Sequence, residues 1–349
     1  MMISKNIKGL REVFSEGLSL FSLPFLVLPF FLFYEKTNIY SQEEKKIVYK
    51  WEIDHYEPQP GKILGIWNYV RTKSELKMLK EKYGYSGVFI MSGEQSLYDI
   101  ATKELGFDKD KLLVSISYPS GTDYYEKWIK DMPAENYYID ESVNHGCLGN
   151  GNRRLYDPDE FKAIKKYIQM LRPGSKLITS GYKRCAHLEE LGKIADLMMY
   201  SSYSNWVYHP ELPCLSNMPW GPKLESSYIE AGYDQRQSWT DMKNIFGKRF
   251  SSTWIKTIEV SEFFDLFAHA KKLGLDQIWV YNYMEEDKNG NPVSCYRSDQ
   301  YEAISQAAYK NGFLKQYLKE MKAVYKRHKG DWIIESESPT GKIKENMIP

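Results

Sequence analysis

The sequence has few cysteines and almost no net charge, and both absences narrow the classes of function. Its 349 residues include only four cysteines, which are widely spaced and form no C-x-x-C pair. This pattern gives no support to a zinc site or a thioredoxin-like redox centre. The 47 basic and 46 acidic residues leave a formal net charge of +1, so the chain carries no field that would attract nucleic acid.

Motifs for phosphate or metal binding are also missing. The turn after the first predicted strand reads Asn-Tyr-Val-Arg at 68–71, whereas a dinucleotide site needs a glycine-rich turn there. The chain has no His-x-His pair near its later strands and no visible internal repeat. We therefore expect no cofactor and no metal, and a metal- or phosphate-dependent enzyme is the weaker alternative.

Aromatic residues, in contrast, are abundant. Tyrosine, phenylalanine and tryptophan number 28, 15 and 9 and make up 15% of the chain. Aromatic faces pack well in cores and also stack on sugar rings. They also stack on nucleic-acid bases. This composition weakly favours a protein with a binding cleft.

The N-terminal residues differ from the rest of the chain. Residues 17–34 form an uncharged apolar run that follows Lys5, Lys8 and Arg11, as in a signal peptide or membrane anchor. We expect 1–34 to direct export to the periplasm, the outside or the cell envelope, with possible membrane attachment through 17–34. An apolar helix packed on the domain is the alternative. Residues 35–60 are polar and read as a linker.

From residue 61 the chain alternates apolar strands with amphipathic helices. Thr72 with Glu75 forms a capping box, and Asp157-Pro158 starts another helix. The pattern predicts eight strands, at 63–69, 87–91, 112–117, 137–139, 177–180, 197–200, 250–255 and 277–283. It also predicts helices at 298–311 and 313–327 and a loosely held polar tail at 329–349. Eight such units over 61–328 are typical of an α/β protein with a (β/α)8 TIM barrel, with an open doubly wound sheet as the alternative.

In a (β/α)8 barrel the carboxyl ends of all strands share one cleft. The fourth predicted strand ends in Asp140 and Glu141, which we take as the candidate catalytic residues; solvated loop charges are the alternative interpretation. The other strand ends supply the candidate substrate-binding residues: Trp67, Asn68, Glu94, Tyr182, Tyr200, Trp254, Tyr281, Asn282 and Tyr283. Trp254 and Trp279 have the alternative role of filling the barrel core.

Aromatic side chains with a few carboxylates suit the cleavage of a glycosidic bond. Such cleavage needs an acid that protonates the leaving oxygen and a second negative group that stabilises the transition state. Glu141 is the candidate acid. The second carboxylate stays open among Glu94, Glu225, Glu285 and Glu286. The neighbouring charged side chains could contribute or could be ordinary loop residues: His145, Lys183 and Arg184.

The strand rhythm, the carboxylates after strand four and the aromatic residues of strands seven and eight together resemble the TIM-barrel glycoside hydrolases. The adjacent Asp140-Glu141 is similar to the pair of the β-N-acetylhexosaminidases. That resemblance implies that Asp140 orients the substrate acetamido group and that Glu141 is the acid. The chain departs from this family by lacking glycines before the pair. It departs from the common retaining families because Trp254-Ile255-Lys256 supplies no carboxylate.

The sequence therefore predicts an exported glycosidase that cleaves an oligosaccharide or polysaccharide, with Glu141 as general acid and Asp140 as the orienting carboxylate. A non-catalytic glycan-binding barrel is the alternative. The sugar, the linkage and the oligomeric state have no signal in the sequence.

Overall fold

The structure, a computed structural model, describes residues 34–35, 45–67, 72–116, 125–139, 158–181, 188–200, 235–255, 260–281, 284–286, 292–294 and 298–347. These residues belong to two compact units. The barrel unit comprises 53–319 and 341–349, and the ribbon unit comprises 1–52 and 320–340. The apolar run at 17–34 lies outside the described residues except for Tyr34, so its role in export stays a prediction.

Eight parallel strands close into a barrel in the order β10-β3-β4-β5-β6-β7-β8-β9. This arrangement confirms the predicted (β/α)8 barrel and excludes the open doubly wound sheet. The strands are β3 (Ile63–Trp67), β4 (Gly87–Ile90), β5 (Leu112–Ser115), β6 (Asn136–Ile139), β7 (Lys176–Gly181), β8 (Leu197–Tyr200), β9 (Ser252–Ile255) and β10 (Gln277–Tyr281).

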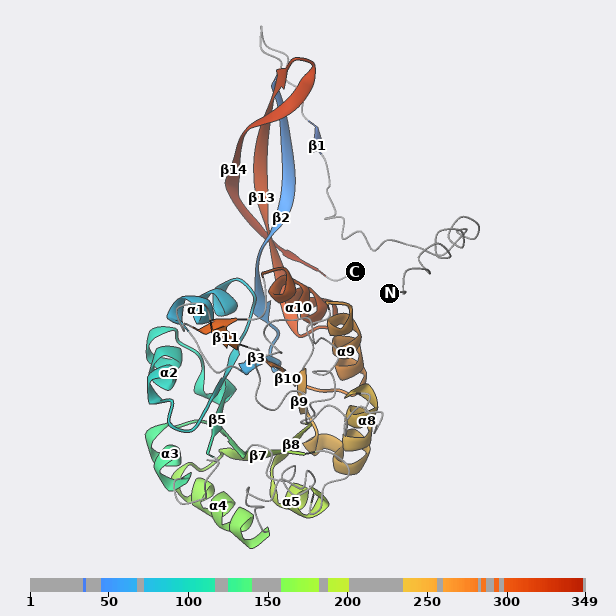
Figure 1. The fold of residues 1–349 in the computed structure, drawn as a ribbon. Helices are drawn as coiled ribbons and strands as arrows, with labels where there is room; N and C mark the ends of the chain where they lie inside the picture. Colours follow the sequence, from blue (N-terminus) through green and yellow to red (C-terminus); the bar gives the residue numbers. More distant parts are fainter. Residues whose placement is uncertain are drawn as a thin grey trace, which may run out of the picture. The chain divides into compact units, whose positions relative to one another are not determined.

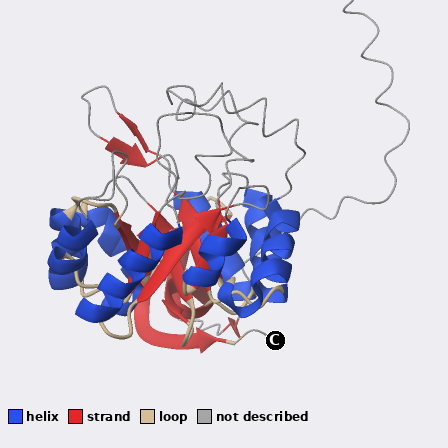
Figure 2. Cartoon of the chain, turned by 90° about the horizontal axis from the view of Figure 1, so that it is seen from below, coloured by secondary structure: helices blue, strands red, loops and turns tan. Residues whose placement is uncertain are grey.

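Helices surround these strands (Figures 1 and 2). The α-helices are α1 (Lys73–Glu81), α2 (Gln95–Asp99), α3 (Tyr125–Asp131), α4 (Pro158–Leu171), α5 (Leu188–Ile194), α8 (Gln235–Phe246), α9 (Val260–Lys272) and α10 (Ser298–Lys310). Shorter helical segments are the π-helical η1 (Ile100–Glu104) and the 3-10 segments η2 (Lys109–Lys111) and η4 (Gly247–Arg249). A small antiparallel sheet joins β11 (Met284–Glu286) and β12 (Pro292–Ser294).

Local sequence explains where these helices begin. The Thr72 hydroxyl accepts a hydrogen bond from the backbone N–H of Glu75 at 3.1 Å, which satisfies one of the free N–H groups in the first turn of α1. Pro158 occupies the first position of α4, where its missing N–H costs nothing. The apolar face of α4 is buried through Phe161, Ile164 and Ile168.

The barrel interior is filled by inward-facing side chains of the strands. They are Ile63, Phe89, Leu113, Tyr138, Ile178, Met199, Trp254 and Trp279. Because alternate residues of a strand face opposite sides, the neighbouring residues Leu64, Val88 and Tyr137 belong to the outer core beneath the helices. The barrel interior is therefore a packed core where these side chains meet, and not an open channel.

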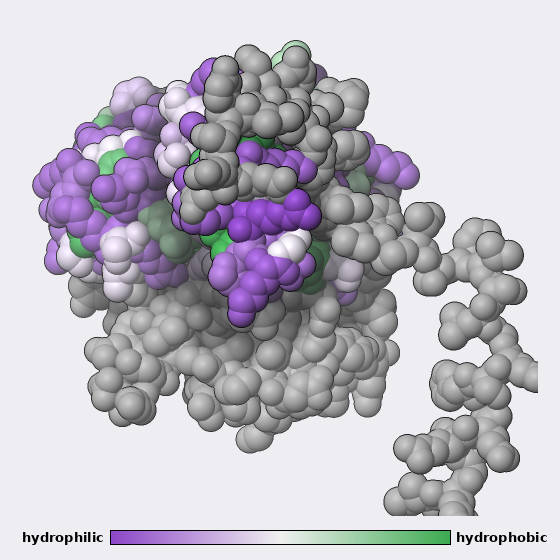
Figure 3. Space-filling view, turned by 90° about the horizontal axis from the view of Figure 1, so that it is seen from above, coloured by the Kyte–Doolittle hydropathy of each residue, from purple (hydrophilic) through white to green (hydrophobic). Residues whose placement is uncertain are grey.

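The described surface in Figure 3 is mainly hydrophilic, with small and separate hydrophobic areas. Among the described residues, no helix is both long enough and apolar enough to span a membrane.

The strands that contribute residues to the ribbon unit contain the larger departure from the sequence-based expectations. These strands belong to a sheet in the order β1-β2-β13-β14, formed by β1 (Tyr34–Glu35), β2 (Lys45–Pro58), β13 (Leu314–His328) and β14 (Asp331–Asn346). The predicted helix at 313–327 is wrong, because this segment is β13. The predicted linker at 35–60 contains β2, and the predicted loose tail at 329–349 contains β14.

Long-range pairing explains this departure. Eleven of the fifteen residues 314–328 are lysine, leucine, glutamine, glutamate, methionine, alanine or arginine, which favour a helix when taken alone. In the folded chain β13 lies between β2 and β14 and forms hydrogen bonds with both, so tertiary context overrides local propensity. A two-residue turn joins β13 to β14, with positive φ angles at Lys329 (50°) and Gly330 (97°), as in a type I′ hairpin.

Ion pairs cross the ribbon from β2 to β14. Lys45 Nζ lies 2.9 Å from a carboxylate oxygen of Glu335. Lys50 contacts both Glu337 and Glu52, and the Glu337 carboxylate is the first cause that raises the pKa of Lys50. The backbone of β1 pairs antiparallel with β2, Tyr34 opposite Tyr49.

Candidate active site at the carboxyl ends of the barrel strands

Strand register brings several predicted substrate-binding residues to one rim. Trp67 ends β3 and is the Cα partner of Tyr281 at the end of β10. Tyr200 ends β8, opposite Gly181 of β7. Because all eight strands run parallel in a closed barrel, these backbone positions belong to the carboxyl-terminal rim, where such barrels carry their active sites.

The end of β6 is held in place by its neighbours on both sides. The Ile116 N–H donates to the Tyr138 carbonyl at 2.9 Å. The Thr179 hydroxyl donates to the Ile139 carbonyl at 3.1 Å, and both residues are fully buried. That carbonyl belongs to the peptide bond that leads into Asp140, so the attachment point of the predicted catalytic pair is fixed.

The two tyrosines of β6 add a hydrogen bond on each face of the strand. Inside the barrel, the Tyr138 hydroxyl donates to Ser180 Oγ of β7 at 2.6 Å. Outside it, the Tyr137 hydroxyl accepts from the Ala134 N–H at 3.1 Å. Burial raises the pKa of the Tyr137 hydroxyl, so it stays protonated at neutral pH. Buried, satisfied hydroxyls of this kind rigidify the backbone that carries them.

Most of the other predicted site residues lie outside the described residues. These are Asp140, Glu141, Asn68, Tyr182, Asn282 and Tyr283, together with His145, Lys183, Arg184 and Glu225. Asn68, Asp140, Tyr182 and Asn282 directly follow the described ends of β3, β6, β7 and β10 in sequence. Their roles stay predictions.

Glu94 is placed in the loop between β4 and α2, where it has a local structural role. Its carboxylate accepts a hydrogen bond from the backbone N–H of Met91 at 3.0 Å. Its carbonyl accepts one from the N–H of Tyr98 at 3.0 Å, which starts α2. The carboxylate therefore stabilises the turn after β4, and a contact with substrate is still only predicted.

Trp254 lies in the barrel interior. Its ring packs against Phe89, Tyr138 and Trp279, with centroid separations of 5.9, 6.0 and 6.0 Å. The side chain is fully buried. These contacts agree with the alternative that Trp254 fills the barrel core. Its role in substrate binding stays a prediction.

Two further candidates for the second carboxylate lie in the described part of the chain. Glu285 and Glu286 lie in β11, opposite Val293 and Pro292 of β12. In the described part of the chain, no group of three or more His, Cys, Asp and Glu side chains is arranged to hold a metal ion.

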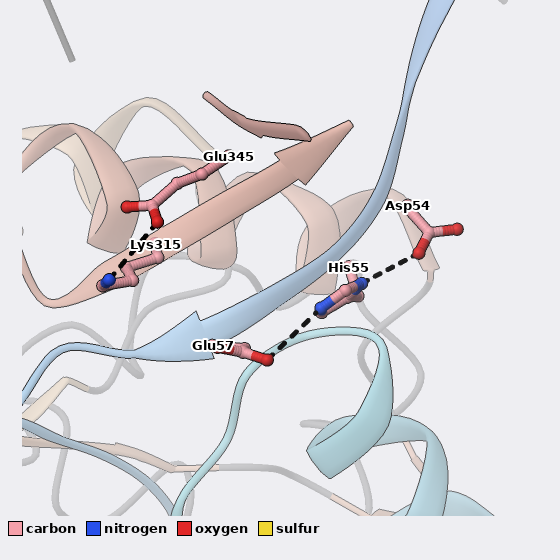
Figure 4. A network of polar contacts seen from close by, with 5 residues as sticks. All are labelled: Asp54, His55, Glu57, Lys315 and Glu345. Carbon is pink, nitrogen blue, oxygen red and sulfur yellow. Dashed lines mark hydrogen bonds and ion pairs between the residues drawn. The ribbon is translucent and has the colours of Figure 1, made fainter. Parts of the chain in front are cut away.

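Figure 4 shows a polar cluster around His55 that no sequence pattern predicted. His55 Nδ1 lies 2.8 Å from Asp54 Oδ2, and its Nε2 lies 3.5 Å from Glu57 Oε1. The imidazole stacks on Tyr317 with ring centroids 4.7 Å apart. Asp54, His55 and Glu57 are neighbours along β2, whereas Tyr317 reaches the imidazole through the pairing of β2 with β13.

This cluster belongs to the opposite end of the barrel from the rim. The next residue along, Tyr56, donates its N–H to the Lys82 carbonyl at 3.1 Å, in the loop that leads into β4. Its hydroxyl donates to Glu302 of α10 at 2.6 Å. Burial raises the pKa of Tyr56, and the Glu302 carboxylate adds to this shift. The amino-terminal face of such barrels serves stability, so we assign the cluster a structural role.

Comparisons with known proteins leave the family open. No family model matches the chain, and no curated protein matches it. Among solved structures, the chain is similar to an FMN-binding beta-glucuronidase from Facaelibacterium prausnitzii, at 10% identity and a TM-score of 0.44, over 87% of this chain and 58% of that enzyme.

Two further solved structures show the range of activities among these similarities. An Ostrinia furnacalis group IV chitinase matches at 9% identity and a TM-score of 0.42, over 72% of this chain and 99% of the chitinase. A 2,3-dimethylmalate lyase matches at 10% identity and a TM-score of 0.39, over 63% of this chain and 76% of the lyase. The similarities are distant, and the barrel is established by the pairing of its own strands.

Proposed function

We propose that the protein is a glycoside hydrolase in which Glu141 is the general acid and Asp140 is the orienting carboxylate. The observation that carries this proposal is the end of β6, which stops at Ile139 in a closed parallel barrel and is held there by the Thr179 hydroxyl. Any side chain directly after this point starts from a rigid strand end at the rim where barrel enzymes place their catalytic groups.

The chemistry of the rim supports the same reaction class. Trp67, Tyr200 and Tyr281 end three of the barrel strands, and aromatic faces suit the C–H faces of sugar rings. A carboxylic acid at such a rim can protonate the glycosidic oxygen, while a second carboxylate orients the group that stabilises the developing positive charge. Asp140 and Glu141 supply these two groups at adjacent positions.

The test is hydrolysis of a panel of oligosaccharides and polysaccharides by the wild type and by variants of the pair. We expect Glu141→Gln to lower kcat by about 10²- to 10⁴-fold, because it removes the proton donor. Asp140→Asn should lower kcat while leaving the folded state intact. Circular dichroism and the unfolding midpoint check folding.

Glu135→Gln is the matched control. Glu135 is exposed and precedes the other end of the same strand, where its carbonyl accepts a hydrogen bond from the Lys176 N–H. This variant should hydrolyse substrate like the wild type. Wild-type turnover by Glu141→Gln would place the acid elsewhere, and glycan binding without turnover across the panel would identify a non-catalytic binding protein instead.

A further inference from the structure

The tip of the ribbon hairpin exposes three large apolar side chains in a row. We define the hairpin tip as residues 326–334, which span the turn between β13 and β14. Trp332, Ile333 and Ile334 are 43%, 49% and 53% exposed. Single exposed apolar residues are ordinary on a protein surface, whereas a contiguous group marks an interaction site.

These side chains lie on both faces of the strand. Successive residues of a strand point to opposite sides, so Trp332 and Ile334 share one face and Ile333 lies on the other. A flat protein partner would cover one face and leave the other in water. A medium that surrounds the tip, such as the outer layer of a lipid bilayer, covers both.

Cationic residues flank the apolar group. Lys326, Arg327 and Lys329 carry positive charge at the tip, where Asp331 is the single carboxylate, and His328 lies between them. Lysine and arginine beside exposed apolar residues are attracted to anionic lipid headgroups. Tryptophan is enriched at the boundary between headgroups and hydrocarbon.

The same unit contains the longest uncharged apolar run of the sequence. The ribbon unit includes residues 17–34, and the last residue of that run, Tyr34, is the first residue of β1 and pairs with Tyr49 of β2.

We propose that the hairpin tip inserts into the surface of an anionic lipid bilayer. Trp332, Ile333 and Ile334 enter the boundary region, and the flanking cations contact the headgroups. This site shares no residue with the barrel rim and does not depend on the proposed hydrolase activity.

The first test measures partition of the full chain onto vesicles by co-sedimentation. The vesicles contain phosphatidylcholine with about one third phosphatidylglycerol, and a second set contains phosphatidylcholine alone. We expect W332S/I333S/I334S to lower the partition coefficient at least about tenfold, because the apolar contact is lost. The matched control is M170S on α4, where Met170 is 65% exposed, and it should bind like the wild type.

A second pair of variants tests the charges. K326Q/R327Q should lower partition onto anionic vesicles by about fivefold for each cation removed, and should leave partition onto neutral vesicles unchanged. The control K271Q/K272Q removes two neighbouring exposed cations at the end of α9, and it should have no effect on either vesicle.

A spectroscopic measurement shows whether the tip itself enters the lipid. Brominated lipid should quench part of the tryptophan fluorescence of the wild type, and W332F should lose that part. This conservative variant keeps an aromatic ring at the tip, so it tests insertion even where the triple serine variant has an altered unfolding midpoint.

Three outcomes would overturn the proposal. One is a wild-type chain that binds neither vesicle, and another is equal binding by the wild type and the triple variant, which would assign attachment to other residues. The third is a triple variant whose only change is a smaller oligomer in sedimentation velocity, which would make the tip a contact between copies of the chain.

Discussion

Gly65 shows how a missing side chain shapes the barrel interior. A Cβ atom at this position would lie 2.2 Å from Cε3 of Trp279. The indole of Trp279 occupies that space and donates its Nε1–H to Ser252 Oγ at 3.1 Å. A small residue on β3 therefore complements a large one on β10, as close packing requires.

We expect Gly65→Ala to destabilise the barrel by about 1–3 kcal/mol, because the added methyl group overlaps a ring that has no room to move. Urea unfolding measures the loss. The same substitution in a Trp279→Leu background should cost less, since the smaller side chain leaves space for the methyl group. Equal costs in the two backgrounds would show that the overlap is not the cause.

Asp54 gives a pH-dependent contribution to stability. Its hydrogen bond with His55, followed by the charge of Lys319 at 3.5 Å, holds the pKa of Asp54 below the ordinary value of 3.8. A carboxylate with a lowered pKa stabilises the folded state above its unfolded-state pKa, and this contribution is lost as the pH falls through the folded-state value.

The wild type should therefore exceed Asp54→Asn in unfolding free energy by about 0.5–1 kcal/mol at neutral pH. The difference should shrink as the pH falls below about 4. Chemical unfolding across this pH range measures both variants. Asp131→Asn is the control, because Asp131 is an exposed residue at the end of α3. A difference for Asp54→Asn that stays constant down to low pH would contradict the assignment.

At the scale of elements, the turn between β13 and β14 sets the register of the hairpin. Both turn residues have positive φ, but only one of them is a glycine. A lysine in this conformation is strained, whereas asparagine adopts it readily and Asn-Gly is the preferred type I′ pair.

Lys329→Asn should stabilise the hairpin by about 0.5 kcal/mol, and Gly330→Ala should destabilise it by about 1 kcal/mol. Amide hydrogen exchange of β14 measures these changes directly, because global unfolding would be dominated by the barrel. Faster exchange in Lys329→Asn, slower exchange in Gly330→Ala, or unchanged exchange in both variants would exclude the turn as a determinant of hairpin stability.

The barrel elements could be predicted because their signals are local. Each strand is a short apolar run, and each neighbouring helix carries its own start signal, such as Thr72 for α1 and Pro158 for α4. Parallel neighbours then follow from the order of the chain. The strand β13 could not be predicted in this way, because its lysine-rich sequence, with leucine, glutamine and methionine, favours a helix until β2 and β14 are present.

At the scale of the whole molecule, the sequence predicts the closed barrel and the rim that its strand ends share. The register confirms that Trp67 and Tyr281 are neighbours on that rim. Asp140 and Glu141 follow a strand end that is well anchored, and their chemical roles stay predictions. The stacking of His55 on Tyr317 and the pairing of β13 with β14 were not predicted, since the local pattern of 314–328 favours a helix.

The sheet that joins β2 to β13 and β14 also has a consequence for synthesis of the chain. Residues 45–58 leave the ribosome before every strand of the barrel, and their partners at 314–328 leave it after all of them. One edge of β2 therefore has no partner strand until β13 has been synthesised. A delay or truncation near the C-terminus would leave that edge open to pairing with other nascent chains, a known route to aggregation.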